Sequence, residues 1–170
     1  FVPLDSTYLF EPTQNIPDGQ HHFVTGVQAN LWMEYIHSMD LIEYMLYPRL
    51  LAVAETGWAP GKKKNYSLFL DKMSHHLRWL DQQAILFRIP EPFGYKNVKE
   101  NDDSFVLDLK PPVVGAQLYY SLDGSAPLTG GQLYETPIEI GRDANIEEIK
   151  CAIVLPSGRT SMDYTIQLTR

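Results

Sequence analysis

Two neighbouring stretches decide how the first half of the chain is interpreted: FVTGVQANLWMEYI at residues 23–36 and LIEYMLYPRLLAVAETGW at residues 41–58. Residues 23–32 are rich in β-forming and apolar side chains and run into a polar end at Glu34, which predicts a short buried strand. Residues 40–58 place apolar side chains on nearly every face of a helix. This pattern is typical of a buried helix that is covered by more than one neighbour.

The ends and the middle of that helix carry recognisable signals. Ser38 or Asp40 can cap its start, because both side chains offer an oxygen to the free N–H groups of a first turn. Pro48 lies inside it. Proline lacks an N–H and clashes with the carbonyl group four residues back, so we expect a kink or a break near Tyr44.

A second helix is predicted over residues 66–84, where apolar side chains recur at the i, i+3, i+4, i+7 spacing of one helix face. Asn65 precedes it as a candidate N-cap. The predicted buried stripe is Tyr66, Phe69, Leu70, Met73, Leu77, Leu80 and Ala84. The predicted solvent side is Lys72, Ser74, Asp81 and Gln82.

The composition changes at residues 89–103, IPEPFGYKNVKENDD, which combine two prolines, a glycine and a polar run and predict a linker. Beyond it the apolar period becomes two, and turns are predicted at Asp123-Gly124, Gly130-Gly131 and Ser157-Gly158. About five to seven short strands predict a small antiparallel β-sandwich, so the fold class is α+β with a helical N-terminal segment. The strand candidates are residues 104–110, 116–121, 137–140, 147–155 and 160–168.

Composition excludes several classes of protein. The 170 residues hold 14 Lys and Arg against 21 Asp and Glu, a net charge of −7, so neither nucleic acid nor an anionic membrane is an expected partner. No apolar run approaches the roughly 18 residues of a membrane helix. A complete (β/α)₈ barrel needs about 250 residues and does not fit. The single cysteine, Cys151, lies in an apolar stretch and is expected to be a buried, inert thiol.

The two opening stretches together resemble the last strand and last helix of the catalytic barrel of glycoside hydrolase family 20, the β-N-acetylhexosaminidases. The family pattern G-x-Q-x-N-L-W-x-E is followed by Y-x-x-x-P-R-x-x-A-x-A-E-x-x-W. FRIPEP at residues 87–92 is similar to the end of that barrel, and YYSLDGSAP at residues 119–127 is similar to a turn of the sandwich appended to it. The matching residues of the long motif are Gly26, Gln28, Asn30, Leu31, Trp32, Glu34, Tyr44, Pro48, Arg49, Ala52, Ala54, Glu55 and Trp58.

The resemblance implies a domain division and an activity. Residues 1–92 would be the C-terminal end of the catalytic barrel domain, with strand 8, helix 8 and a following helix, and residues 93–170 the accessory β-sandwich. Family members remove terminal N-acetylglucosamine or N-acetylgalactosamine by a retaining route in which the 2-acetamido group of the substrate is the nucleophile. An adjacent Asp-Glu pair assists it, and this sequence contains no Asp-Glu dipeptide. The expectation is therefore an inactive C-terminal fragment with no catalytic residue of its own.

By the same resemblance, Trp32 and Glu34 are the substrate-binding candidates. Trp32 would form a wall of the pocket, with its indole against the apolar face of the sugar. Glu34 would accept hydrogen bonds from the O4 and O6 hydroxyls. On pattern alone, a core tryptophan and a solvated glutamate explain the same two residues. Arg49 and Glu55 suggest a buried pair that supports the barrel floor, because unpaired buried charge is rare.

Other readings remain open at this point. The sandwich could be a non-catalytic glycan-binding or structural module, with an aromatic row drawn from Tyr119, Tyr120, Tyr134 and Tyr164. The five histidines show no metal-ligand spacing, so neither a metal nor a cofactor is predicted. Barrel-derived surface without its neighbours predicts burial against other copies of the chain or repacking. The resemblance also implies a secreted or periplasmic parent enzyme, whose glycan substrates carry a terminal N-acetylhexosamine.

Overall fold

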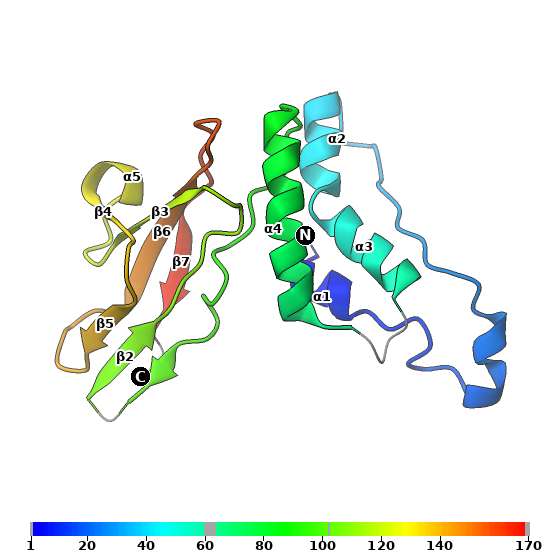
Figure 1. Cartoon of the computed structure of the whole chain (residues 1–170), viewed down its shortest axis with the longest axis horizontal. Helices are drawn as coiled ribbons and strands as arrows, with labels where there is room; N and C mark the ends of the chain where they lie inside the picture. Colours follow the sequence, from blue (N-terminus) through cyan, green and yellow to red (C-terminus); the bar gives the residue numbers. More distant parts are fainter. Residues whose placement is uncertain (1, 60–63, 102, 169–170) are drawn as a thin grey trace. The chain divides into compact units, whose positions relative to one another are not determined.

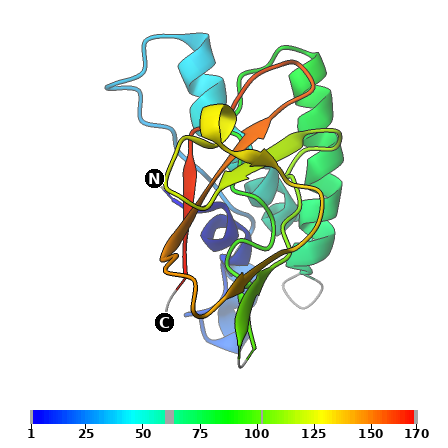
Figure 2. The same ribbon diagram turned by 90° about the vertical axis from the view of Figure 1, so that its left-hand side faces the viewer.

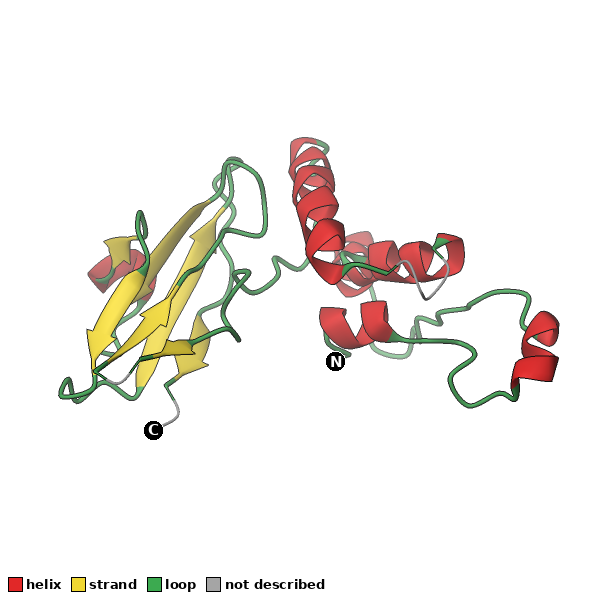
Figure 3. Cartoon of the chain, turned by 60° about the horizontal axis from the view of Figure 1, so that its bottom comes forward, coloured by secondary structure: helices red, strands yellow, loops and turns green. Residues whose placement is uncertain are grey.

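The computed structural model describes residues 2–59, 64–101 and 103–168. The chain forms two units, residues 1–88 and 89–170, and each is described by itself. Figure 1 shows helices in the first unit and strands in the second, and Figure 3 shows the same division by secondary structure. The α+β fold class is thus confirmed. The units divide between Arg88 and Ile89, and the domain boundary expected after residue 92 stays a prediction.

The described residues of the first unit form five helical segments. Their bounds are α1 (Leu4–Leu9), the 3₁₀ helix η1 (Asp18–Phe23), α2 (Met39–Leu46), α3 (Arg49–Trp58) and α4 (Tyr66–Gln82). α1 packs against α3 and α4. Its Tyr8 is buried, and the Tyr8 ring stacks on Phe69 of α4 with the ring centroids 4.6 Å apart. The core of this unit lies under α4, and its main members are Phe69, Met73, Leu77, Leu80 and Phe87.

Both predicted helix caps are confirmed. The Ser38 side chain accepts a hydrogen bond from Leu41 N at 3.2 Å, and the Asn65 side chain accepts one from Leu68 N at 3.0 Å. Each bond satisfies one N–H of a first turn that has no partner within its helix. The caps therefore fix where α2 and α4 begin.

The long helix predicted over residues 40–58 is broken, but at Pro48 and not near Tyr44. α2 ends at Leu46, Tyr47 is extended (φ −91°, ψ 140°), and α3 begins after Pro48. A residue that precedes proline is pushed out of the helical region, so the helix ends before the proline instead of bending a turn earlier.

Two expectations for this unit were wrong. The strand predicted at residues 23–32 does not form: Phe23 ends η1, and residues 24–32 are neither helix nor strand. The described part of the first unit contains no strand that could pair with their backbone groups. The helix was also expected to be buried all round, yet α2 has no buried residue and α3 buries only Ala52 and Thr56. The other elements of this unit therefore cover α2 and α3 only in part, since residues 41–46 of α2 are half-buried on every face.

The predicted stripe of α4 is confirmed at its centre, whereas two residues of its predicted solvent side are buried. Ser74 donates to the Asp71 carbonyl at 2.7 Å, and Asp81 lies 3.6 Å from Arg78 in an ion pair. Each buried polar side chain therefore has a partner on its own helix, and this partner offsets the free-energy cost of removing the polar group from water.

The described residues of the second unit form two antiparallel sheets. Figure 2 shows the strands of this unit from a second side. One sheet has the order β1-β2-β5, from strands β1 (Lys99–Glu100), β2 (Ser104–Leu107) and β5 (Ile138–Gly141). The other has the order β4-β3-β6-β7, from strands β4 (Gln132–Leu133), β3 (Gln117–Ser121), β6 (Glu148–Val154) and β7 (Tyr164–Gln167). The short helix α5 (Pro127–Gly130) takes the place of the turn predicted at Gly130-Gly131.

Register explains which side of each sheet is buried. Phe105 pairs with Ile140 in the first sheet, and Leu118 pairs with Ile153 in the second, and all four side chains are buried. Because side chains alternate across a strand, these pairs mark the side of each sheet that faces the core. The predicted β-sandwich follows from this alternation.

Candidate functional site

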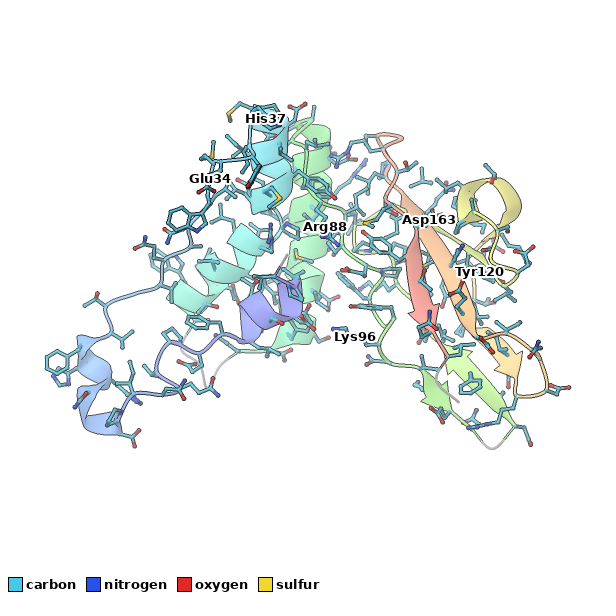
Figure 4. The ribbon with its side chains drawn as sticks, turned by 180° about the vertical axis from the view of Figure 1, so that it is seen from behind. Glu34, His37, Arg88, Lys96, Tyr120 and Asp163 are labelled. Atoms are coloured by element: carbon cyan, nitrogen blue, oxygen red, sulfur yellow. The ribbon has the colours of Figure 1, made fainter. Side chains whose placement is uncertain are left out.

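Trp32 and Glu34 lie on a segment without helix or strand that leads from η1 to α2. Trp32 is 74% exposed, and Glu34 is also exposed. Glu34 lies within a turn that begins directly after Trp32, because Ile36 N donates to Met33 O at 3.1 Å. Figure 4 shows Glu34 and His37 on this segment, next to α2. The Ser38 cap thus fixes the end of the segment where the two candidate side chains lie.

The side chains of this segment fall on two sides. Val27 and Leu31 are half-buried, and Val27 lies near Gly57 of α3: a Cβ at Gly57 would be 3.5 Å from a Val27 methyl group. Gln28 and Asn30 are exposed, and Gln28 Nε2 donates to Asn30 Oδ1 at 2.7 Å. The hydrogen bond shows that the two amides project to the same side. The motif pattern contained both amides, but nothing in the sequence indicated that they bond to each other.

Arg49 begins α3 and donates to the Met45 carbonyl group. Burial lowers the pKa of Arg49, and the nearby charge of Arg88 lowers it further. Glu55 forms an ion pair with Lys72 of α4, with 3.8 Å between the charged atoms. The expected pairing of Arg49 with Glu55 stays a prediction.

A further contact set joins residues 86–88 to the α2–α3 junction. Glu43 accepts a hydrogen bond from Leu86 N at 2.8 Å, and Arg88 N donates to Tyr47 O at 3.3 Å. These contacts hold the segment that follows α4 against the point where α2 ends. Sequence reasoning missed them, because no local motif pairs residues so far apart.

The tyrosines of the sandwich serve mainly to hold it together. The Tyr134 hydroxyl accepts a hydrogen bond from Leu109 N at 2.8 Å, and the Tyr134 backbone N–H donates to Leu118 O at 2.7 Å. Tyr134 therefore links the segment that follows β2 to strand β3. Burial is the main cause that raises the pKa of Tyr134. The buried Tyr164 donates to the Ile89 carbonyl group. These bonds favour a structural role for Tyr134 and Tyr164 over a place in an exposed aromatic row that binds glycan.

The turn at Asp123-Gly124 has the predicted form. Asp123 Oδ1 accepts from Ser125 Oγ at 2.6 Å and from Ser125 N at 3.0 Å, and these bonds lower the pKa of the carboxyl group. Gly124 has φ 78°, which only glycine adopts without strain. The aspartate therefore shapes its own loop.

Across residues 2–59, 64–101 and 103–168, no three His, Cys, Asp or Glu side chains are grouped so that they could hold a metal ion. No helix in the described part of the chain is long and apolar enough to cross a membrane.

The helical unit that carries Trp32 and Glu34 and the sandwich unit each match a known family. Residues 1–61 match the glycosyl hydrolase family 20 catalytic domain, and residues 101–165 match the chitobiase/beta-hexosaminidase C-terminal domain. The two parts of the chain are thus similar to the catalytic domain and to the C-terminal domain of β-hexosaminidases.

Individual relatives agree with this assignment. A beta-hexosaminidase of Porphyromonas gingivalis is 32% identical over 84% of this chain and 19% of that protein. A beta-hexosaminidase of Vibrio furnissii is 39% identical over 33% of this chain and 10% of that protein. A beta-N-acetylhexosaminidase of Cellulomonas fimi is 31% identical over 48% of this chain and 16% of that protein. The chain therefore spans at most about a fifth of the length of these relatives.

Proposed function

We propose that this chain is the C-terminal part of an exo-β-N-acetylhexosaminidase, which removes terminal N-acetylglucosamine or N-acetylgalactosamine from glycans. The observation that carries the proposal is the match of residues 1–61 to a family 20 catalytic domain, within which Trp32 and Glu34 are exposed. The names of the relatives support the same substrate class.

In this proposal the two residues bind the terminal sugar. The indole of Trp32 packs against the apolar C–H face of the pyranose. The Glu34 carboxylate accepts hydrogen bonds from the O4 and O6 hydroxyls, and a charged acceptor makes such bonds stronger. Neither residue transfers a proton to the glycosidic oxygen.

The chemical step is substrate-assisted and retaining. The acetamido oxygen of the substrate attacks the anomeric carbon, the glycosidic bond breaks, and water later opens the cyclic intermediate with retention. The Asp-Glu pair that orients the acetamido group and supplies the proton belongs to the remaining part of the enzyme. Residues 1–170 alone are therefore inactive in this proposal.

The test compares hydrolysis of a chromogenic N-acetylglucosaminide by residues 1–170 and by the longer enzyme that carries them. We expect activity in the longer enzyme only. In that enzyme, Trp32→Ala and Glu34→Gln should each lower kcat/KM at least tenfold, mainly through KM. The exposed His37→Gln serves as a matched control that should retain activity. Hydrolysis by residues 1–170 alone would contradict the proposal, because an acid within this chain would then suffice.

We also propose that residues 1–170, produced alone, self-associate through the first unit. Its exposed large apolar side chains include Trp32, Met33, Tyr35, Met39 and Trp58. Exposed apolar surface of this extent favours association in water. Sedimentation velocity should give species larger than the 19.4 kDa monomer. A monomer that also binds no hydrophobic dye would count against this proposal.

A further inference from the structure

The chain is fastened to the first unit as far as Arg88. Leu86 N donates to the Glu43 carboxylate at 2.8 Å, and Arg88 N donates to Tyr47 O at 3.3 Å. Phe87, which lies between the two donors, is completely buried. The peptide unit that ends in the Arg88 N–H is therefore held by a residue of the first unit.

The second unit fastens the chain from the next residue onward. The Tyr164 hydroxyl donates to the Ile89 carbonyl group, and Ile89 is buried. A few residues later, Phe93 and Lys110 exchange two backbone hydrogen bonds of 2.9 and 3.0 Å. The stretch that the sequence predicts as a linker, residues 89–103, is therefore part of the second unit from its first residue.

The peptide unit between Arg88 and Ile89 is what separates these two attachments. Its orientation depends on the φ and ψ angles of the two residues, because the peptide group itself is planar. Pro90 follows, and a residue before proline is confined to extended conformations, which narrows the angles open to Ile89. Most of the remaining freedom is therefore rotation about the backbone bonds of Arg88.

We propose that the junction of Arg88 and Ile89 is a hinge without a linker, which limits how far the two units turn relative to each other. Relative motion is the default expectation for two domains of one chain, and a flexible linker between them increases it. Within the described residues 86–93, the attachments on both sides leave no stretch that could act as such a linker. The sandwich is therefore not a binding module on a flexible tether. This inference does not depend on the proposed function.

The experiment measures the distance between two spin labels by pulsed electron paramagnetic resonance. Leu68→Cys on α4 and Leu128→Cys on α5 place one label on each unit, at side chains that are 51% and 40% exposed. The labelled chain is diluted in an excess of unlabelled chain, so that the distances recorded lie within one chain. Cys151 is completely buried and does not take up label. We expect a narrow distribution of distances in the unaltered junction.

Two changes at the junction test the inference. Inserting Gly-Ser-Gly-Ser between Arg88 and Ile89 adds a span of about 11 Å and should at least double the width of the distance distribution. Tyr164→Phe removes the bond to the Ile89 carbonyl group but keeps the buried ring, and it should widen the distribution less. An equal width with and without the insertion would overturn the inference, because the junction would then not be what limits the motion. A label pair within the sandwich, Leu128→Cys with Met162→Cys, should stay narrow in every variant, which establishes that this unit is folded.

Discussion

At the scale of single residues, Cys151 lies at the centre of β6 and is completely buried. Burial raises the pKa of its thiol from 9.0 to about 12, and the charge of Asp163 acts in the same direction. The thiol is therefore neutral in the folded chain well into the alkaline range. Its sequence context predicted a buried, inert thiol, and its burial is confirmed.

The raised pKa predicts a loss of stability in alkali. Below pH 9 the thiol is protonated in both states and contributes no pH dependence. Between pH 9 and about 12 the unfolded chain loses the proton that the folded chain keeps, so the free energy of unfolding falls by up to about 1.4 kcal/mol per pH unit. Urea unfolding at several pH values should show this fall, and Cys151→Ala should have a smaller one. Equal slopes in both proteins would show that the thiol is not responsible.

The candidate site could be predicted from the sequence only in part. The motif named Trp32 and Glu34 as candidates, because a long pattern with many fixed positions points to individual residues, and their role in binding sugar stays a prediction. The hydrogen bond between Gln28 and Asn30 could not be predicted, since it depends on how the segment runs in space. The partner of Glu55 on α4 was missed for the same reason.

At the scale of elements, α4 offers two leucines in contrasting surroundings. Leu77 is completely buried, whereas Leu68 is 51% exposed. Leu77→Ala should lower the free energy of unfolding by about 2–5 kcal/mol, because it removes buried methyl groups and leaves a cavity. Leu68→Ala, the matched control, should change it by no more than about 0.5 kcal/mol. Urea unfolding measures both losses. Similar losses in the two variants would show that Leu77 is not packed more closely than Leu68.

The start of the same helix provides a second test. Asn65→Ala removes the acceptor that Leu68 N uses, and it should cost about 1 kcal/mol. Asn65→Asp retains an acceptor and should cost much less. Urea unfolding measures both, and equal losses would show that the cap bond is not what the asparagine contributes.

Elements with a clear local pattern were predicted well, and those that depend on distant neighbours were not. The period-two pattern found the strands of the sandwich because each strand has one buried side. The caps of α2 and α4 were found because a cap is a contact within three residues. The strand predicted at residues 23–32 failed, because a strand needs a partner that the described helical unit does not contain.

At the scale of the molecule, the second unit has a core made from its own two sheets. Buried side chains of β2 and β5 and of β3, β6 and β7 supply that core. Residues 89–170 produced alone should therefore fold, with a β-type circular dichroism spectrum and a cooperative thermal transition. A random-coil spectrum would show that this unit depends on the preceding residues.

The bond from the Tyr164 hydroxyl to the Ile89 carbonyl joins the last strand of the second unit to its first residue. It has a consequence for how such chains can be recombined. Residues 89–170 therefore carry both partners of the bond that joins their beginning to their last strand. A recombination event outside residues 89–170 would move both partners of this bond together. The new host protein would then not have to supply a partner for Tyr164. Through this bond, Tyr164 favours the transfer of the sandwich between genes as one unit.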